Sequence, residues 1–212
     1  MQSAATFWNK IAPKYAKSPV RDEQVYARKL EITQSYLNPD MRVLEFGCGT
    51  GTTALHHAPF VQEYIATDIA QDMIRIAEQK CVEHDIANVK FSVGTLDSAF
   101  EEEQPFDAVL ALNVLHLLPD WRTQIEAVYR LLPVGGLFIT STGCLKEKIP
   151  WSWLRFVTPL LCTLRVLPTV VYFNKAAFRD FIVQSGFKIE HDWSPERSPI
   201  TSFLICRKRP ED

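Results

Sequence analysis

The sequence predicts an α/β fold in which a doubly wound, largely parallel sheet carries helices on both faces. Short apolar segments alternate with amphipathic segments through the first two thirds of the chain. A glycine-rich turn, "GCGTG" at 47–51, follows the first apolar segment and precedes a helical pattern. Two extended segments close the chain. In such a fold the ligand crevice lies beyond the carboxyl ends of the strands.

Five short apolar segments, bounded by turn residues, are expected to be buried parallel strands: 41–47, 63–68, 89–94, 106–113 and 135–141. Two segments between them have apolar residues at helical spacing, namely Met73, Ile74, Ala77 and Cys81 in 71–85, and Trp121, Ile125, Val128 and Leu132 in 120–132. Asp120 is expected to cap the second of these helices.

The last third predicts one helix and a hairpin at the edge of the sheet. The helix, 174–187, has Asn174 as its expected cap, Gly186 as its stop, and an apolar stripe of Ala177, Phe178, Phe181 and Ile182. The extended segments 188–193 and 202–209 are joined by a Ser/Pro-rich turn.

The composition of the 212 residues, 47% hydrophobic and 23% charged, is typical of one soluble globular domain. A net charge of -2 disfavours nucleic acid as a substrate, because phosphate binding needs a basic face. Five separated cysteines without metal-ligand spacing predict reduced thiols, a cytoplasmic location and no metal site. The first residues lack the basic start and apolar core of a secretory signal.

The glycine turn and Asp68 together predict a nucleoside site. Glycines allow the backbone to approach a ligand, and a carboxylate at the end of the next strand can accept hydrogen bonds from both ribose hydroxyls. A dinucleotide fingerprint would have its third glycine at position 52, which is Thr52 here. The spacing therefore disfavours a dehydrogenase and favours S-adenosylmethionine.

Several motifs occur in the order of a known family: "VLEFGCGTG", "ATDIAQDMI", "FDAVLALNVLHLLPD", "YRLLPVGGLFITS" and "QSGFKIE". Over about 7–208 the chain resembles the class I S-adenosylmethionine-dependent methyltransferases, especially the small-molecule ubiquinone/menaquinone-biosynthesis group. The resemblance implies a Rossmann-like seven-stranded sheet of order 3-2-1-4-5-7-6 with strand 7 antiparallel. It also implies a single domain, 1–212, with an N-terminal helical cap (about 1–38) and an apolar lid (about 145–173).

The resemblance also implies roles for individual residues. Glu45 and the backbone of Gly47, Cys48, Gly49 and Gly51 would hold the methionine part of the cofactor, Asp68 the ribose, Ile69 and Met73 the adenine, and Asn113 the sulfonium region. Tyr15 would lie on a helix folded over the cofactor; the alternative is that Tyr15 only packs. The family's acidic residue for the adenine amino group is replaced by Thr95, followed by Leu96 and Asp97, and "LLPVGG" replaces Lys-Pro-Gly-Gly.

The expected acceptor site combines His116 with aromatic residues of the insertion, Trp151, Trp153, Phe156 and Tyr172. Catalytic roles for His116 and Tyr15 are hypotheses; His116 is as well explained as a residue at the edge of the core. The insertion is read as a lid, with a packed helix pair and a membrane-surface helix bearing Arg155 and Arg165 as alternatives.

The leading interpretation is an enzyme that methylates a small apolar acceptor, aromatic, quinone-like or thiol, and releases S-adenosylhomocysteine. Two alternatives stay open: a phospholipid-headgroup N-methyltransferase in peripheral contact with a membrane, and a non-catalytic adenosyl-binding partner protein. The acceptor atom and the choice between monomer and homodimer are left open.

Overall fold

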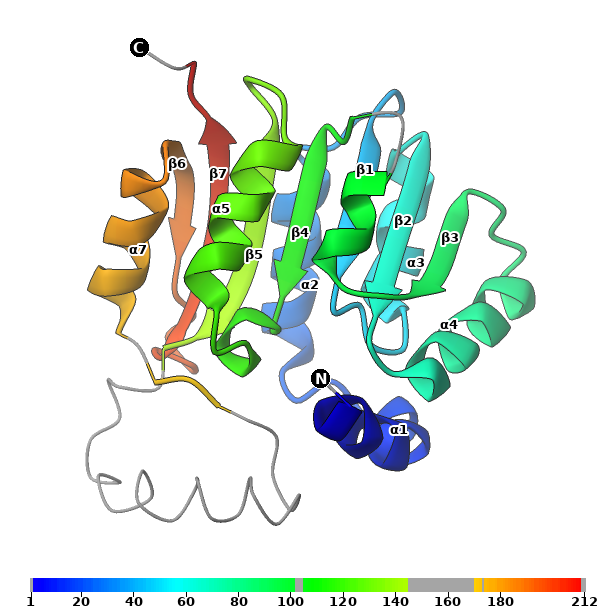
Figure 1. Cartoon of the computed structure of the whole chain (residues 1–212). Coiled ribbons are helices and arrows are strands. Elements are labelled where there is room, and N and C mark those ends of the chain that lie inside the picture. The colour runs from blue at the N-terminus through cyan, green and yellow to red at the C-terminus, as the bar shows by residue number, and fades with distance from the viewer. Residues whose placement is uncertain (1, 102–104, 145–169, 173, 211–212) are drawn as a thin grey trace, which may run out of the picture.

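The computed structural model describes residues 2–101, 105–144, 170–172 and 174–210, and its centre is a seven-stranded sheet of order β3-β2-β1-β4-β5-β7-β6 (Figure 1). The strands are β1 (Arg42–Phe46), β2 (Glu63–Asp68), β3 (Val89–Val93), β4 (Ala108–Leu112), β5 (Leu137–Gly143), β6 (Phe187–Trp193) and β7 (Thr201–Lys208). β1 to β5 pair in parallel, whereas β7 runs antiparallel to β5 and β6. The predicted strand order and terminal hairpin are confirmed.

Helices cover both faces of this sheet, as predicted. They are α1 (Gln2–Lys17), α2 (Glu23–Gln34), α3 (Thr52–His57), α4 (Gln71–Glu83), α5 (Trp121–Leu131) and α7 (Lys175–Gln184), with short 3-10 helices η1 (Ala58–Phe60), η2 (Leu96–Glu101) and η3 (Leu115–Leu117). α5 and α7 lie in front of the sheet in Figure 1, and α2 and α3 lie behind it. The sheet is therefore the middle layer of three.

Each face of the sheet has its own apolar core. Leu44, Phe138 and Phe187 meet side chains of α5 and α7 on one face. Val43 and Leu110 meet side chains of α2 and α3 on the other. Because successive side chains of a strand point to opposite faces, a central strand buried on both sides reads as a continuous apolar run.

The edge strand β3 corrects one prediction. Segment 89–94 was expected to be buried, yet no residue of β3 is fully buried, and Val93 is 54% exposed. β3 pairs with β2 alone, so its outer edge has no neighbouring strand. Apolar composition therefore identified the strand but not its place at the edge.

The ends of two helices test the predicted caps. The Asn174 side chain accepts a hydrogen bond from the amide of Ala177 at 2.8 Å, which confirms that cap. Asp120 does precede α5, but its side chain makes no capping bond and instead accepts a hydrogen bond from the side-chain amide of Gln124 (Nε2) at 2.8 Å. The sequence therefore predicted the position of Asp120 at the start of α5 correctly and the role of its side chain wrongly.

α1 lies below the sheet at the end where the parallel strands terminate (Figure 1). Ala12 packs with Ala70 and Met73 next to α4, and Asn9 accepts a hydrogen bond from the Asp72 amide at 2.8 Å. α1 therefore borders the expected ligand crevice. Most of the expected lid, residues 145–169 and 173, lies outside the described residues. Among the described helices, none is long and apolar enough to span a bilayer.

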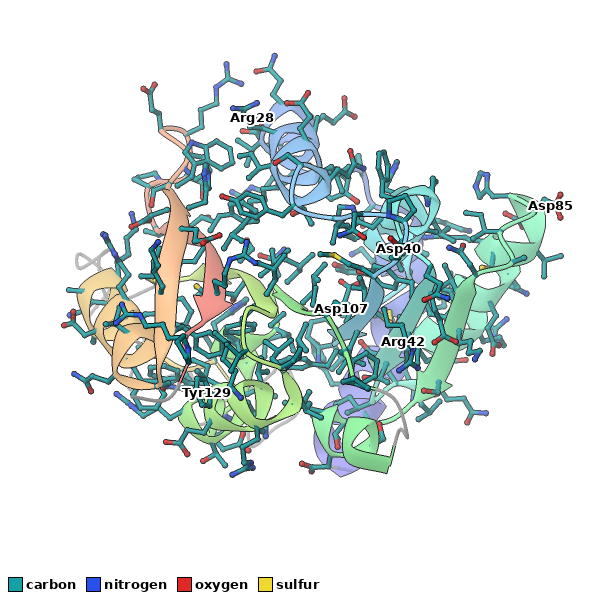
Figure 2. The ribbon with its side chains drawn as sticks, turned by 90° about the horizontal axis from the view of Figure 1, so that it is seen from above. Arg28, Asp40, Arg42, Asp85, Asp107 and Tyr129 are labelled. Carbon is teal, nitrogen blue, oxygen red and sulfur yellow. The ribbon has the colours of Figure 1, made fainter. Side chains whose placement is uncertain are left out.

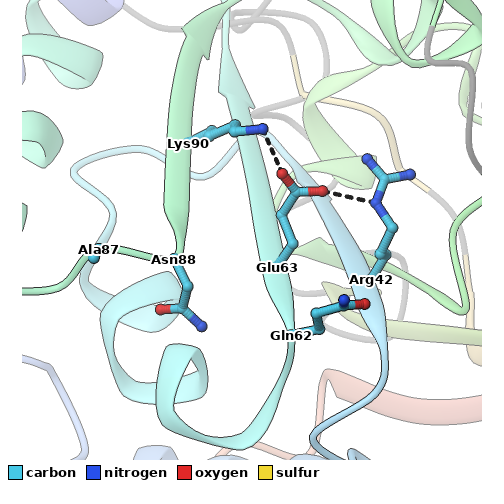
Figure 3. A pocket seen from close by; sticks show the side chains of 6 residues that line it. All are labelled: Arg42, Gln62, Glu63, Ala87, Asn88 and Lys90. Atoms are coloured by element: carbon cyan, nitrogen blue, oxygen red, sulfur yellow. Dashed lines mark hydrogen bonds and ion pairs between the residues drawn. The ribbon is translucent and has the colours of Figure 1, made fainter.

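A pocket of about 300 Å³ opens at the opposite end of the sheet, where β1, β2 and β3 begin (Figure 3). Glu63 lies between two cations there: it accepts a hydrogen bond from Arg42 Nε at 2.7 Å and pairs with Lys90. The Arg42 amide also donates to the Asp107 carboxylate at 2.8 Å, and both residues lie near the middle of the sheet end in Figure 2. These mutually satisfied charges hold strand ends together and do not form a ligand site.

Glu63→Gln should lower the free energy of unfolding by about 1–2 kcal/mol at pH 7, because it weakens hydrogen bonds to two cations. Lys90 and Arg42 lower the pKa of Glu63, so this deficit should shrink as the pH falls through that lowered pKa and the wild-type carboxyl protonates. Urea unfolding between pH 7 and pH 3 measures both effects, because the deficit shrinks only below the ordinary pKa of 4.5. An equal deficit at every pH would show that charge on Glu63 is not the cause.

Candidate functional site

The five-residue loop between β1 and α3, residues 47–51, contains three glycines with left-handed backbone: Gly47, Gly49 and Gly51 have φ of 69°, 55° and 72°. A Cβ on Gly47 would lie 2.5 Å from the Val114 side chain, and one on Gly51 would lie 2.6 Å from the Phe91 ring. Gly49 differs, because the nearest atom to its Cβ position is 3.8 Å away in the Tyr15 ring. The loop is thus packed at both ends and open at Gly49, where a ligand can approach the backbone.

Asp68 ends β2 and joins this loop to the loop that leads into α4. Its Oδ2 accepts a hydrogen bond from the Gly49 amide at 2.9 Å, and its Oδ1 accepts one from the Ala70 amide at 2.9 Å. Asp68 is 9% exposed, and burial raises the pKa of its carboxyl while the amide hydrogen bonds lower it. Each oxygen keeps a further acceptor position, enough to receive two hydroxyls of a sugar.

Glu45 lies behind the loop, on β1. It is 2% exposed, and its Oε2 accepts a hydrogen bond from the Tyr64 hydroxyl at 2.9 Å. Burial raises the pKa of Glu45 to about 8, outweighing the Tyr64 hydrogen bond that lowers it, and the charge of Asp68 adds to the increase. A cationic group brought close to Glu45 would favour its ionised form.

Lys80 is a residue of this region that the sequence reasoning missed. Its Nζ donates hydrogen bonds to the Thr50 carbonyl at 3.0 Å, and to the hydroxyls of Thr50 and Thr52 at 3.1 and 2.8 Å. The ammonium of α4 therefore fixes the turn where the glycine loop enters α3. Its sequence signal is weak, since a lysine one turn before the end of a helix is ordinarily solvated.

On the side of the expected adenine site, the structure brings together some predicted residues and buries others. Ile69 is half-buried, whereas Met73 is 2% exposed and packs against α1. Leu96 is 1% exposed, so only its backbone is available to a ligand. The Thr95 hydroxyl accepts a hydrogen bond from the Asp97 amide at 3.3 Å, a local turn at the start of η2.

Asn113 directly follows β4 and has φ of 59°, a left-handed conformation that few residues other than glycine adopt. Its amide donates to the Ser141 carbonyl at 2.6 Å. His116 follows in η3, with Nδ1 3.3 Å from the Thr142 hydroxyl, and burial lowers its pKa, so it is neutral at pH 7. The strained Asn113 and the neutral imidazole thus lie at the neighbouring ends of β4 and β5.

The other predicted acceptor residues are only partly described. The His116 carbonyl accepts a hydrogen bond from the Val171 amide at 2.8 Å. Tyr172, the residue after Val171, is half-buried. Trp151, Trp153 and Phe156 lie outside the described residues, so their roles stay predictions.

Tyr15, on α1, covers the glycine loop from the open side. It is 51% exposed, and its ring makes an edge contact with Trp8 at 6.4 Å between centroids. Partial burial raises the pKa of the Tyr15 phenol, and the charges of Asp68 and Glu45 add to the increase. Tyr15 therefore remains protonated and can donate a hydrogen bond, which fits a positioning role better than that of a base.

Together these residues fit an adenosyl group with a cationic amino-acid tail. The open backbone at Gly49, the two acceptor positions on Asp68 and the buried acid Glu45 match a ribose and a positively charged chain. Within the part of the chain that the structure describes, no group of three or more His, Cys, Asp or Glu side chains could hold a metal ion.

Comparison with known proteins gives a family for this arrangement. Residues 43–136 match the family model described as a methyltransferase domain. The chain is 33% identical over 123 residues to the uncharacterized methyltransferase YcgJ of Bacillus subtilis, covering 56% of this chain and 49% of YcgJ. It is 33% identical over 171 residues to the ubiquinone biosynthesis O-methyltransferase of Xanthomonas oryzae pv. oryzae, covering 80% of this chain and 65% of that protein. The chain thus spans less than two thirds of these curated relatives.

Solved structures support the same fold. The complex of DhpI with S-adenosylhomocysteine superposes with a TM-score of 0.72 at 19% identity, over 99% of this chain and 97% of that one. The magnesium protoporphyrin IX methyltransferase ChlM from Synechocystis, with bound S-adenosylhomocysteine, gives 0.67 at 19% identity, over 96% and 93%. At these identities the likeness establishes the fold alone.

The raised pKa of Glu45 predicts a pH-dependent stability. Because its folded-state pKa is about 8 and its ordinary value is 4.5, ionisation of Glu45 increasingly disfavours the folded state as the pH rises from about 4.5 to 8. Glu45→Gln removes this titration. The free energy of unfolding of the variant, relative to that of the wild type, should therefore increase by about 1–3 kcal/mol as the pH rises from about 4.5 to 8. Denaturant unfolding at pH 5, 6.5 and 8 tests this. A constant difference would show that Glu45 is already ionised in the folded protein.

The family match, residues 43–136, contains the glycine loop, Glu45, Asp68 and Asn113, so it includes the residues that the geometry brings together. The strand order of the sheet is the one expected from the sequence motifs. Residues 43–136 are therefore a methyltransferase domain, and the sheet that contains them has the fold of the class I S-adenosylmethionine-dependent methyltransferases.

Proposed function

We propose that the protein binds S-adenosylmethionine at the carboxyl ends of β1, β2 and β4 and transfers its methyl group to a small acceptor. The observation that carries this proposal is the Asp68 carboxylate, which is held by the amides of Gly49 and Ala70 beside an open glycine loop. That arrangement supplies ribose acceptors and close backbone approach in one place.

The cofactor would be held by residues at the carboxyl ends of four strands, β1 to β4, and by their neighbours. The backbone of Gly47 to Gly51, including Cys48, and the Glu45 carboxyl would bind the amino-acid part, and Asp68 would accept hydrogen bonds from the ribose. Ile69, Met73 and the backbone around Thr95, Leu96 and Asp97 would border the adenine. Asn113 would lie nearest the sulfonium, with Tyr15 as a cover.

Methyl transfer requires mainly that the acceptor atom is aligned with the methyl group and that water is excluded, because the sulfonium is already an activated methyl donor. A lone pair of the acceptor attacks the methyl carbon as the sulfur–carbon bond breaks, the bonding electrons pass to sulfur, and S-adenosylhomocysteine leaves. A hydroxyl or thiol acceptor also loses a proton. His116, neutral at pH 7 and close to the end of β5, would accept it.

The class of acceptor is proposed from the relatives. The Xanthomonas relative is named for O-methylation in ubiquinone biosynthesis and aligns with 80% of this chain. This supports a small aromatic or quinone-like acceptor. A phospholipid-headgroup N-methyltransferase and a non-catalytic adenosyl-binding partner are the alternatives, and transfer of labelled methyl to phenols, thiols, quinols and phospholipids separates them. Label in phospholipid, or cofactor binding without any transfer, would overturn the proposal.

Asp68→Ala should weaken binding of S-adenosylhomocysteine about 10- to 100-fold, because it removes charge-assisted acceptors and frees the Gly49 amide. Isothermal titration calorimetry measures this. Asp107→Ala is the matched control, since Asp107 also accepts a backbone N–H bond but lies at the opposite end of the sheet. If both variants bind S-adenosylhomocysteine like the wild type, Asp68 does not hold the ribose.

His116→Ala should reduce kcat about 100-fold for an acceptor that must lose a proton, and leave the Kd of S-adenosylhomocysteine unchanged. Because burial lowers the pKa of His116, the wild-type rate should rise as the pH passes through a value below 6.5 and then level off. The variant should lack this step. A wild-type rate and pH profile in the variant would exclude His116 as the base.

A further inference from the structure

Lys29 is a half-buried cation that the proposed chemistry has not used. It lies on the inner side of α2, and its Nζ donates a hydrogen bond to the Ser141 hydroxyl at 2.8 Å. Ser141 is 1% exposed and lies in β5, where it pairs with Leu112 at the end of β4. The ammonium is thus held against the sheet close to its carboxyl edge.

Two contacts place this ammonium beside the reaction site. The Ser141 carbonyl accepts the Asn113 amide at 2.6 Å, so Lys29 bonds to the same residue that holds the strained end of β4. One turn earlier on α2, the Tyr26 hydroxyl lies 3.1 Å from the Thr53 hydroxyl, next to the glycine loop. This side of α2 therefore borders the site from the loop to the end of β5.

The charge of Lys29 lacks an acidic partner among the residues that the structure describes, where its one hydrogen bond is to a neutral hydroxyl. Burial alone lowers its pKa to about 8, which reflects the cost of an ammonium removed from water. Its neighbour Arg28 contrasts with it: that side chain is 60% exposed, pairs with Glu31 at 3.0 Å and points away from the sheet (Figure 2). A half-buried ammonium with unused donors can bind an anion.

We propose that Lys29 binds an anionic oxygen of the methyl acceptor, a carboxylate or an ionised phenol. The proposal rests on the proposed methyltransferase function and narrows its acceptor to an apolar acid. Ser141 and Thr142 are consecutive in β5, so their side chains point to opposite faces of the sheet. Lys29 bonds to Ser141 on one face, and His116 bonds to Thr142 on the other. The acceptor would therefore lie across the end of β5, with its anionic group bound by Lys29.

The test compares 3,4-dihydroxybenzoate with its methyl ester, which lacks the carboxylate, in the presence of S-adenosylhomocysteine. Calorimetry should show that the wild type binds the acid at least ten-fold more tightly than the ester. Lys29→Met should lose at least ten-fold in affinity for the acid and keep its affinity for the ester. Lys29→Arg should retain most of the preference, and Arg28→Met, the matched control on the exposed face, should retain all of it.

A second readout follows the Lys29 ammonium itself by NMR, with its signal assigned by its absence in Lys29→Met. Binding of the acid should move its titration to higher pH, since an anion favours the charged form, and the ester should not. Equal binding of acid and ester by the wild type, absence of acid binding, or an unmoved titration would each overturn the assignment. Loss of both ligands in Lys29→Met would also overturn it, by showing that Lys29 only anchors α2.

These outcomes are distinct from failure of the proposed function. All four proteins should bind S-adenosylhomocysteine with the same Kd, because Lys29 lies on the acceptor side. If the wild type does not bind S-adenosylhomocysteine, the methyltransferase proposal itself fails. If it binds S-adenosylhomocysteine and methylates a neutral phenol without preferring the acid, the methyltransferase proposal stands and the assignment of Lys29 is wrong.

Discussion

The hydrogen bonds accepted by Asp68 are the constraint on which the candidate site depends. A loop with three left-handed glycines has little intrinsic preference for one shape, and its conformational entropy must be offset by fixed contacts. Asp68 supplies one anchor, through the Gly49 amide, and Lys80 supplies the other, at Thr50 and Thr52. Because both anchors come from the β2–α4 unit, pairing of β1 with β2 shapes the loop and forms the crevice in one step.

The second feature of the site is its distribution of charge. Burial raises the pKa of both Glu45 and Asp68, so the β1–β2 end holds two acids in a poorly solvated place. An acidic environment of this kind costs stability in the free protein and is offset when a cation binds. The β5 end carries the half-buried ammonium of Lys29 and the neutral imidazole of His116. The two ends therefore favour ligands of opposite charge.

Local patterns in the sequence predicted most of the fold, and long-range contacts explain what they missed. Asn174 was found as a cap because its partner is three residues away. The exposure of β3 was missed, since an apolar segment does not encode whether a strand has one neighbour or two. Lys29 was missed for the same physical reason: its partner, Ser141, is 112 residues away, and only the packing of α2 on β5 brings them together. Glycine spacing indicated a nucleoside site, whereas the half-buried ammonium of Lys29 could be identified only from its contacts in the folded structure.

The separation of these contacts has a consequence for specificity. Most residues proposed to hold the cofactor lie at the carboxyl ends of β1 to β4, whereas Lys29 lies on α2 and bonds to Ser141 of β5. Sites without shared partners change independently to a first approximation. Substitution on the inner face of α2 can therefore alter the acceptor without rebuilding the cofactor loop. Asn113 is the exception, because its amide bonds to the Ser141 carbonyl and so links the β4 end, nearest the proposed sulfonium position, to the residue that holds Lys29.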